Sequence, residues 1–522
     1  MNDSHFAVTR SFVIMASTTL VVAIVAIVKE AVVAQNFGAS EDLDAFVFSS
    51  SVAYFVPTLL AITLQGTFVP IFYEALKVDA RRGWLFASVT LTILWMVMVA
   101  CTILLWLGGH FLIAVMVPGF QKSGQTLALL LLWTLLPTVI LSGVNEQLKN
   151  TLNALKVFGL PSFVQIIPSI TSIVTIVLWK GPWGIYAFAI GWNVGLFAQT
   201  VILAWGLKVK GGVYVPRVDC SQREFARLIT QGAPYLIVPL SSLGILFVDK
   251  YFASYLGTGA ISYFNYAEKL FRVPWMIIAA ALFTTALPYF SEQLARSRVE
   301  LREAISLTVR LAAFLTIPVV VVMSVLSQPL TAVLFERGSF TSQDTSGTAI
   351  VLVGFMASLF LYTVTFILDR GLCVLGATTM LMNLALATFV LKVLCAWVMT
   401  QVWGLQGLAL STAPVLALQG LGMYLMLTRL LGRFDLSGLI GCLGKTIFAS
   451  AAMAVPLLAI WHHGSVFAGL MRDNVPNTIV LVLAITVGAL AYWLTAIGMK
   501  SAEASALLKV LWGRGQVKGV LK

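Results

Sequence analysis

The stretch "FNYAEKLFRVP", residues 264–274, places one acid and two bases inside a strongly apolar chain. Glu268 and Arg272 are four residues apart with the acid first, which is the favourable order for an ion pair along a helix. Lys269 shares a helical face with Arg272 and has no acid four residues away on either side. Two interpretations stay open. One is a structural salt bridge beside a lysine that snorkels toward water; the other is a cationic patch that binds an anionic group in a cavity.

Lys29 and Glu30 form a second charged pair, just before the turn "NFGAS" at residues 36–40. If the patches around Lys29 and Lys269 face one cavity, their charge suits a phosphate or a diphosphate. The candidate substrate-binding residues from these two stretches are Lys29, Glu30, Glu268, Lys269 and Arg272.

Asp249 and Lys250 precede another turn, "YLGTG" at residues 255–259. Adjacent helical residues point about 100° apart, so these two need not pair with each other. Asp249 is a candidate ligand for a coupling cation, or else a structural partner for a neighbouring helix. Lys392 is either the partner of Asp249 or unrelated to it.

The composition predicts a membrane protein. The 522 residues are 59% hydrophobic and only 10% charged, with a mean hydropathy of +0.95, whereas soluble domains carry about 25% charged residues. Apolar runs of about 18 residues or more recur, each long enough to cross a bilayer. We therefore predict an all-α polytopic membrane protein. The net charge of +12 comes from short loops between apolar runs, so we expect no nucleic-acid partner.

The sequence contains no pattern typical of a catalytic or metal site. The five cysteines show no CxxC spacing, and the four histidines fit neither a zinc site nor a catalytic triad. A membrane glycosyltransferase or polymerase would need such groups, usually with a sizeable extramembrane segment. We therefore expect a transporter rather than an enzyme, without catalytic residues, metal or cofactor.

Charges, glycines and prolines divide the chain into about fourteen candidate transmembrane helices. The predicted spans are 8–35, 45–73, 84–117, 125–153, 159–179, 184–207, 226–255, 261–290, 303–334, 345–368, 376–400, 404–428, 438–461 and 476–499. Most of the 33 Lys and Arg residues fall on one side of this arrangement. Because cytoplasmic loops are enriched in these bases, both termini are predicted to lie in the cytoplasm.

The chain contains an internal repeat with an offset of about 219 residues. The matching pairs, in order, are "NFGAS" (36–40) with "YLGTG" (255–259), "FVPIFYEAL" (68–76) with "ALPYFSEQL" (286–294), "QKSGQT" (121–126) with "FTSQDT" (340–345), and "WGIYAFA" (183–189) with "WGLQGLA" (403–409). Each repeat spans six helices, so both copies enter the membrane in the same orientation.

Parallel repeats of this kind predict two six-helix lobes around a central cavity, which is the natural substrate site. We expect an N-lobe at 1–215, a C-lobe at 216–433 and two additional helices at 434–500. Residues 501–522 are expected to form a basic cytoplasmic tail.

The chain resembles the MurJ/MviN family, the lipid II flippases of the MOP exporter superfamily. The resembling segments are "KEAVVAQNFGASEDLDAF" (29–46), "FVPIF" (68–72), "VMVPGF" (115–120), "LNALKVFGLPSF" (152–163), "VDKYFASYLGTGAISYFNYAEKL" (248–270) and "LFERGSFTSQDT" (334–345). The resemblance implies fourteen helices, two lobes and a central basic cavity. It also implies a bacterial inner-membrane flippase that moves undecaprenyl-diphosphate-linked peptidoglycan precursor to the outer leaflet.

The resemblance also implies roles for particular residues. Lys29 and Lys269 stand where the family usually has cavity arginines. Asp44 matches the acid before Ala-Phe and joins the substrate-binding candidates, and Asp249 matches an acid linked in some members to sodium. Because lysine lacks the bidentate fork of arginine, it contacts a diphosphate as a point charge.

The chain departs from the family pattern in its first two helices. Ala23 stands where members usually carry an arginine, and residues 55–70 contain neither a base nor the Glu-Gly-Ala-Phe motif. A flippase for a polyprenyl-linked exopolysaccharide or O-antigen unit therefore stays an alternative, as does a drug/cation antiporter. The expected partners are the lipid-linked oligosaccharide, membrane lipids and cell-wall or polysaccharide synthases. Sodium, protons or the membrane potential would supply the energy.

Overall fold

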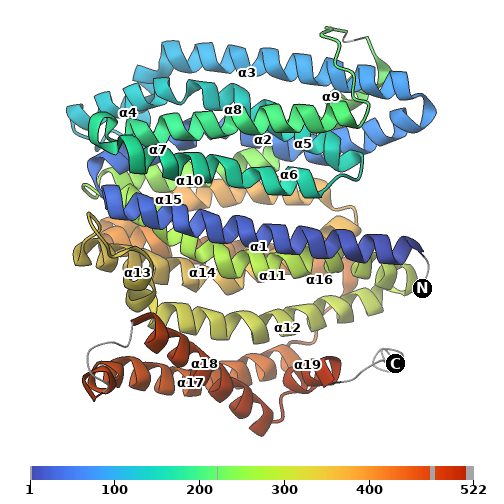
Figure 1. Cartoon of the computed structure of the whole chain (residues 1–522). Coiled ribbons are helices and arrows are strands. Elements are labelled where there is room, and N and C mark those ends of the chain that lie inside the picture. Colours follow the sequence, from blue (N-terminus) through green and yellow to red (C-terminus); the bar gives the residue numbers. More distant parts are fainter. Residues whose placement is uncertain (1–2, 220, 471–476, 513–522) are drawn as a thin grey trace. The chain divides into compact units, whose positions relative to one another are not determined.

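The computed structural model describes residues 3–219, 221–470 and 477–512, which form helices and connecting turns with no strand among them (Figure 1). Their contacts divide the chain into unit 1, Met1–Asn265 with Arg337–Asp344, and unit 2, Tyr266–Glu336 with Thr345–Lys522. The all-α prediction is confirmed.

Unit 1 contains the first ten α-helices and one short 3-10 helix. They are α1 (Asp3–Phe37), α2 (Glu41–Val78), α3 (Ala80–Met116), α4 (Lys122–Thr134), α5 (Leu136–Ala154), α6 (Gly159–Phe163), η1 (Val164–Ile166), α7 (Ile167–Trp183), α8 (Tyr186–Val209), α9 (Arg223–Tyr235) and α10 (Ile237–Ser254). Helix α5 packs against α2, α3 and α8, and α7 packs against α8.

Unit 2 contains most of α11 and the helices that follow it. They are α11 (Ala260–Arg296), α12 (Arg298–Val325), α13 (Ser327–Phe335), α14 (Ser342–Val374), α15 (Thr378–Leu410), α16 (Thr412–Leu431), α17 (Leu436–Leu470), α18 (Asn477–Gly498) and α19 (Ala502–Trp512). Part of the predicted tail is thus helical, and residues 513–522 lie outside the described residues.

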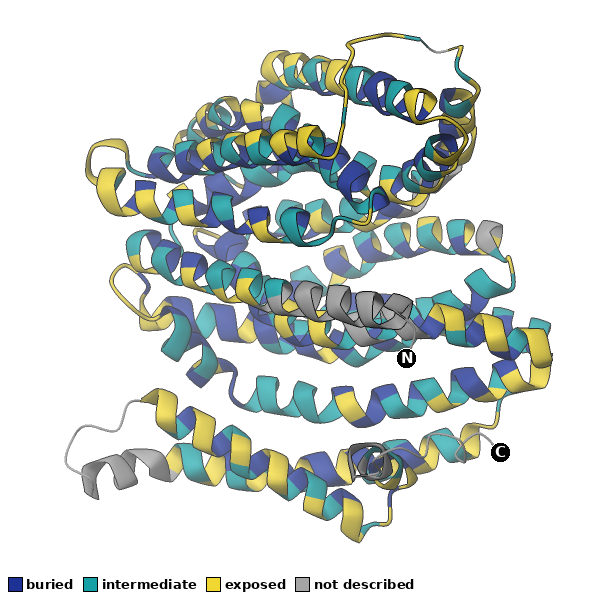
Figure 2. Ribbon diagram, turned by 45° about the vertical axis from the view of Figure 1, so that its right-hand side comes forward, coloured by how far each residue is buried: buried dark blue, intermediate teal, exposed yellow. Residues whose placement is uncertain are grey.

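Apolar side chains hold α12, α17 and α18 together in one core. Phe314, Met453, Leu457 and Ala484 are buried there, and Tyr492 donates a 2.7 Å hydrogen bond to the Phe314 carbonyl. In Figure 2, α17 and α18 carry exposed residues along one side and buried residues along the other. Exposed apolar side chains of this kind suit contact with lipid.

Ten helices within the described part of the chain are long and apolar enough to cross a membrane. Helices α4 and α5, bent by 44°, would make an eleventh span if taken together. The count of fourteen and the side on which each terminus lies stay predictions.

Three predicted spans are each broken into two helices. The spans 125–153, 226–255 and 303–334 are interrupted at Leu135, Leu236 and Leu326. In each case a proline stands in the first turn of the second helix, namely Pro137, Pro239 and Pro329. Proline has no N–H to donate to the preceding turn, and it fits best at the start of a helix. The sequence is apolar on both sides of each break, so the apolar pattern alone predicted one continuous helix.

The internal repeat is visible in the backbone. Gly184 has φ 52° and ψ −133°, and its counterpart Gly404 has φ 55° and ψ −129°. Gly38 and Gly257 both have positive φ, before α2 and α11 respectively. These left-handed turns explain why glycine recurs at the same place in both copies. The predicted boundary at Gly404 is therefore real, although α15 runs on to Leu410.

We expect Gly38→Ala to destabilise unit 1 by roughly 1–3 kcal/mol, because a side chain is strained at positive φ. Gly38 has φ +59°, and an added Cβ would also collide with the Ser339 carbonyl oxygen. Gly66→Ala is the matched control, since nothing lies within 4 Å of its added Cβ and alanine favours the helix. Thermal unfolding in detergent should show a lower Tm for the Gly38 variant alone; equal Tm values would contradict the account.

Candidate functional site

Lys29 lies buried in α1, with only 7% of its surface exposed. Its Nζ atom is 2.8 Å from Glu30 Oε1. The same atom is 5.5 Å from the ring centroid of Phe188 and 4.9 Å from that of Trp192, both in α8. Because aromatic faces attract cations, these rings stabilise the buried ammonium without neutralising it.

Further aromatic contacts hold this arrangement in place. Phe188 stacks on Phe46 of α2 with ring centroids 4.0 Å apart, and Trp192 Nε1 donates a 2.6 Å hydrogen bond to Tyr54 Oη, also in α2. Lys29 is therefore held by α1, α2 and α8 together. The sequence analysis missed these rings, although the four-residue spacing of Phe188 and Trp192 puts them on one helical face.

Asp44 lies in the first turn of α2 and is 2% exposed. Its carboxylate accepts hydrogen bonds from Gly259 N at 2.6 Å, Ser262 N at 2.7 Å and Ser262 Oγ at 2.6 Å. Ser262 lies in the first turn of α11, whose N–H groups have no partners within the helix, and Gly259 directly precedes that helix. This contact shows Asp44 holding the start of α11 in position.

The predicted pair in α11 is confirmed. Arg272 donates to Glu268 Oε1 from Nε at 2.9 Å and from Nη2 at 2.6 Å. The Arg272 side chain is 57% exposed within the protein, and Lys269 is half-buried one residue after Glu268. An exposed base and a half-buried base therefore lie on the same helix of unit 2.

The remaining candidates lie in α10 and α15. Asp249 is 9% exposed in α10 of unit 1, and the neighbouring Lys250 Nζ lies 6.0 Å from the Phe247 ring centroid. In unit 2, Lys392 is fully buried and donates to Ser411 Oγ at 2.8 Å and Thr412 Oγ1 at 2.9 Å. Lys392 thus binds hydroxyl groups at the break between α15 and α16.

Each unit also contains a cavity. The cavity in unit 2, about 1100 Å³, is lined by parts of α11, α12, α14 and α16. The cavity in unit 1, about 760 Å³, is lined by α2, α5, α6 and the segments beside α6. Among the described residues, no group of three or more His, Cys, Asp or Glu side chains could hold a metal ion.

Comparison with known proteins decides the family. The model of the lipid II flippase MurJ family matches residues 33–471. The chain belongs to the lipid II flippase MurJ family. The matched range covers most of the chain and includes Asp44, Asp249 and Lys269, while Lys29 lies just before it. The chain is therefore a multi-pass membrane protein of a family found in the bacterial inner membrane.

Curated MurJ relatives are similar at low identity. The probable lipid II flippase MurJ of Synechocystis sp. is 25% identical over 511 residues, covering 91% of this chain and 93% of the relative. The probable lipid II flippase MurJ of Bdellovibrio bacteriovorus is 28% identical over 317 residues, or 59% of this chain and 60% of the relative. The lipid II flippase MurJ of Burkholderia cenocepacia is 24% identical, covering 80% and 84%.

Solved structures show the same fold. The inward closed conformation of lipid II flippase MurJ superposes with a TM-score of 0.77 at 21% identity, covering 96% of this chain and 99% of that one. An inward-facing MATE transporter of the MOP superfamily gives 0.66 at 16% identity, covering 80% and 98%. Because the family model and the curated relatives are those of lipid II flippases, neither the antiporter nor the polysaccharide-unit alternative is favoured.

Proposed function

We propose that this chain translocates lipid II, the undecaprenyl-diphosphate-linked peptidoglycan precursor, from the inner to the outer leaflet by alternating access. The family match over residues 33–471 is the observation that carries this proposal. Buried cationic groups support it, because a diphosphate needs compensating charge inside a membrane.

In this proposal Lys29 of unit 1 binds the diphosphate, and Lys269 of unit 2 is a further cationic residue that binds the substrate. The rings of Phe188 and Trp192 hold the Lys29 ammonium at fixed distances, and Glu30 shares its charge. A charged residue at mid-membrane costs at least about 2.5–3.5 kcal/mol on insertion scales, which selects against it unless it has a function. Glu268 holds the guanidinium of Arg272 by two hydrogen bonds, and Asp44 positions the start of α11.

The proposed activity is transport, with no covalent step assigned to any residue. Asp249 would bind a coupling cation such as sodium or a proton, or the membrane potential would supply the driving force. Moving one elementary charge through the field supplies about 2.3 kcal/mol per 100 mV. Replacing sodium by potassium during transport would distinguish a sodium requirement from the other two sources.

The departures from the family pattern fall on described helices. Ala23 is half-buried in α1, and residues 55–70 lie in α2. This stretch of α2 contains no base, and its uncharged polar residues Thr58 and Gln65 line the cavity of unit 1. The proposal therefore assigns the diphosphate contact to Lys29 rather than to helix 2.

We expect this chain to restore lipid II exposure in bacteria depleted of their own flippase. The assay measures how much lipid II an external, membrane-impermeant enzyme can reach. Its control is an equal amount of the Lys269→Ala variant, confirmed to be in the membrane. Wild-type exposure no higher than in depleted cells would contradict lipid II as the substrate, and would direct the search to other polyprenyl-linked glycans.

A further inference from the structure

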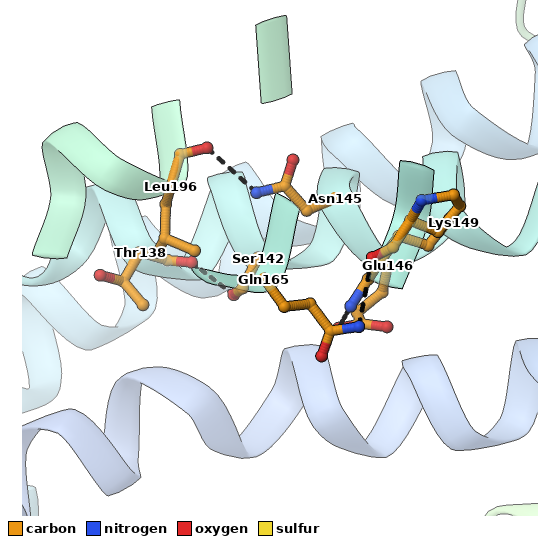
Figure 3. Close-up of polar contacts among 8 residues, drawn as sticks. Thr138, Ser142, Asn145, Glu146, Lys149, Gln165 and Leu196 are labelled. Atoms are coloured by element: carbon orange, nitrogen blue, oxygen red, sulfur yellow. Dashed lines mark hydrogen bonds and ion pairs between the residues drawn. The ribbon is translucent and has the colours of Figure 1, made fainter. Parts of the chain in front are cut away.

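Helix α5 carries a polar face that is unusual for a buried membrane helix. Ser142, Asn145, Gln147 and Asn150 are each 5% exposed or less. Part of this face holds unit 1 together, because Asn145 Nδ2 donates to the Leu196 carbonyl of α8 at 3.1 Å. Figure 3 shows this contact on one side of the helix, with Glu146 and Lys149 on another side.

The side of α5 that carries Glu146 and Lys149 lines the 760 Å³ cavity of unit 1. The polar side chains around it are Tyr54, Thr58, Gln65, Ser142, Glu146, Lys149, Asn150, Asn153, Ser162 and Gln165. Figure 3 shows Glu146, Lys149 and Gln165 converging between the helices. Gln65 and Gln165 are exposed, whereas Ser142 and Asn150 are buried. The cavity is therefore lined by polar side chains both at its solvent-exposed part and at its buried part.

The charges in this cavity cancel. Lys149 Nζ lies 2.5 Å from Glu146 Oε1, and no other Asp, Glu, Lys or Arg lines the cavity within the described residues. A phosphate would meet one base that is already paired, and a cation would meet one acid that is already paired. An apolar ligand would leave many amides and hydroxyls without partners, at a cost of about 1–3 kcal/mol for each buried group.

Asn150 contributes a buried side chain to this cavity. It is 4% exposed, and its Nδ2 finds no hydrogen-bond partner within the part of the chain that the structure describes. Buried donors are nearly always satisfied in native proteins. Because Asn150 lines the cavity, we take its amide as the donor to a ligand there.

We infer that this cavity binds a sugar of the lipid-linked substrate. Amide side chains both donate and accept, which matches the hydroxyl and acetamido groups of a sugar, and the rings of Tyr54 and Phe158 offer flat apolar surface. The volume lies within the usual range for small-ligand sites, about 300–1,000 Å³. The inference rests on the proposed function, and it adds a glycan subsite to it.

The cavity is connected to Lys29 through two side chains. Tyr54 lines the cavity and accepts the hydrogen bond of Trp192, whose ring lies 4.9 Å from Lys29 Nζ. A substrate whose diphosphate meets Lys29 would therefore have its glycan close to this cavity. The diphosphate and the glycan would then be recognised by separate groups of unit 1.

The test compares two ligands on the purified full-length protein. Lipid II carries the glycan, whereas undecaprenyl diphosphate has the same lipid and diphosphate without it. We expect Asn150→Ala to weaken lipid II binding about tenfold and to leave the Kd for undecaprenyl diphosphate unchanged. Since Asn150 Nδ2 has no partner to lose among the described residues, the variant should keep the wild-type Tm. Asn150→Leu, which keeps a similar shape, removes the donor and adds no charge, should behave in the same way.

Other outcomes have distinct meanings. If both ligands weaken equally, or neither changes, the glycan subsite is wrong. If Asn150→Ala lowers the Tm, the Leu variant, which has a similar shape, decides by the same comparison of two ligands. If the wild-type protein prefers lipid II and exposes it in vesicles while the variants keep that preference, only the inference fails. If the wild-type protein neither prefers nor exposes lipid II, the proposed function fails.

Discussion

Lys269→Ala reduces lipid II translocation at least tenfold and leaves the protein in the membrane. This result is expected because the variant removes a cation that would bind the substrate. Hydrogen bonds to charged groups contribute about 1.5–3 kcal/mol each, and each 1.4 kcal/mol is a factor of ten. The measurement is the initial rate at which lipid II in reconstituted vesicles becomes accessible to an impermeant enzyme.

Two further variants make the Lys269 result specific. Lys269→Arg keeps the charge and should keep most of the transport rate. Lys208→Ala removes an exposed lysine at the end of α8 and should transport at the wild-type rate. Wild-type transport by the Lys269→Ala variant would show that the base is structural, which is the other interpretation of the "AEKLFR" stretch.

Asp44→Ala is expected to have the largest effect on stability. The carboxylate accepts three hydrogen bonds from Gly259 and Ser262, and its removal leaves buried donors at the start of α11. Each buried donor left without a partner costs roughly 1–3 kcal/mol. The variant should therefore show a much lower Tm in detergent and reduced accumulation in the membrane.

A matched pair separates this role from substrate binding. Asp44→Asn keeps one acceptor oxygen and should fall between the wild-type protein and the alanine variant. Ser262→Ala removes one of the three donors, so its effect should be smaller when Asp44 is already absent. If Asp44→Ala unfolds at the wild-type Tm yet loses transport, the assignment of Asp44 to positioning is wrong.

Local patterns predicted the parts of the structure that depend on local geometry. The ion pair between Glu268 and Arg272 follows from their spacing of four residues along one helix. The turns at Gly38 and Gly257 and the span boundaries at Gly184 and Gly404 were predicted from glycine, because left-handed backbone excludes most other residues. Apolar runs located the helices, since crossing a membrane requires a continuous apolar length.

Contacts between distant segments could not be predicted in the same way. Asp44 binds Gly259 and Ser262, more than 200 residues later, and no local pattern encodes that pairing. The cage around Lys29 joins α1 to Phe188 and Trp192 of α8. Both contacts depend on how helices pack within unit 1.

The polar face of α5 was hidden for a different reason. Lys149 lies near the end of the predicted span 125–153, and its side chain is 14% exposed and paired with Glu146. The repeated Asn and Gln residues between 145 and 153 were the available signal. In an apolar span, uncharged amides are a weaker sign of a binding site than charged residues are. Here these amides lie beside the inferred glycan subsite.

The most direct test of the account is translocation of lipid II by the purified protein in vesicles. Lipid II is placed in both leaflets, and the fraction that an impermeant enzyme can reach is followed over time. The account predicts that the accessible fraction rises well beyond the outer-leaflet half, and that it rises far more slowly with Lys269→Ala. An accessible fraction equal to that of protein-free vesicles would contradict the assignment of this chain as a lipid II flippase.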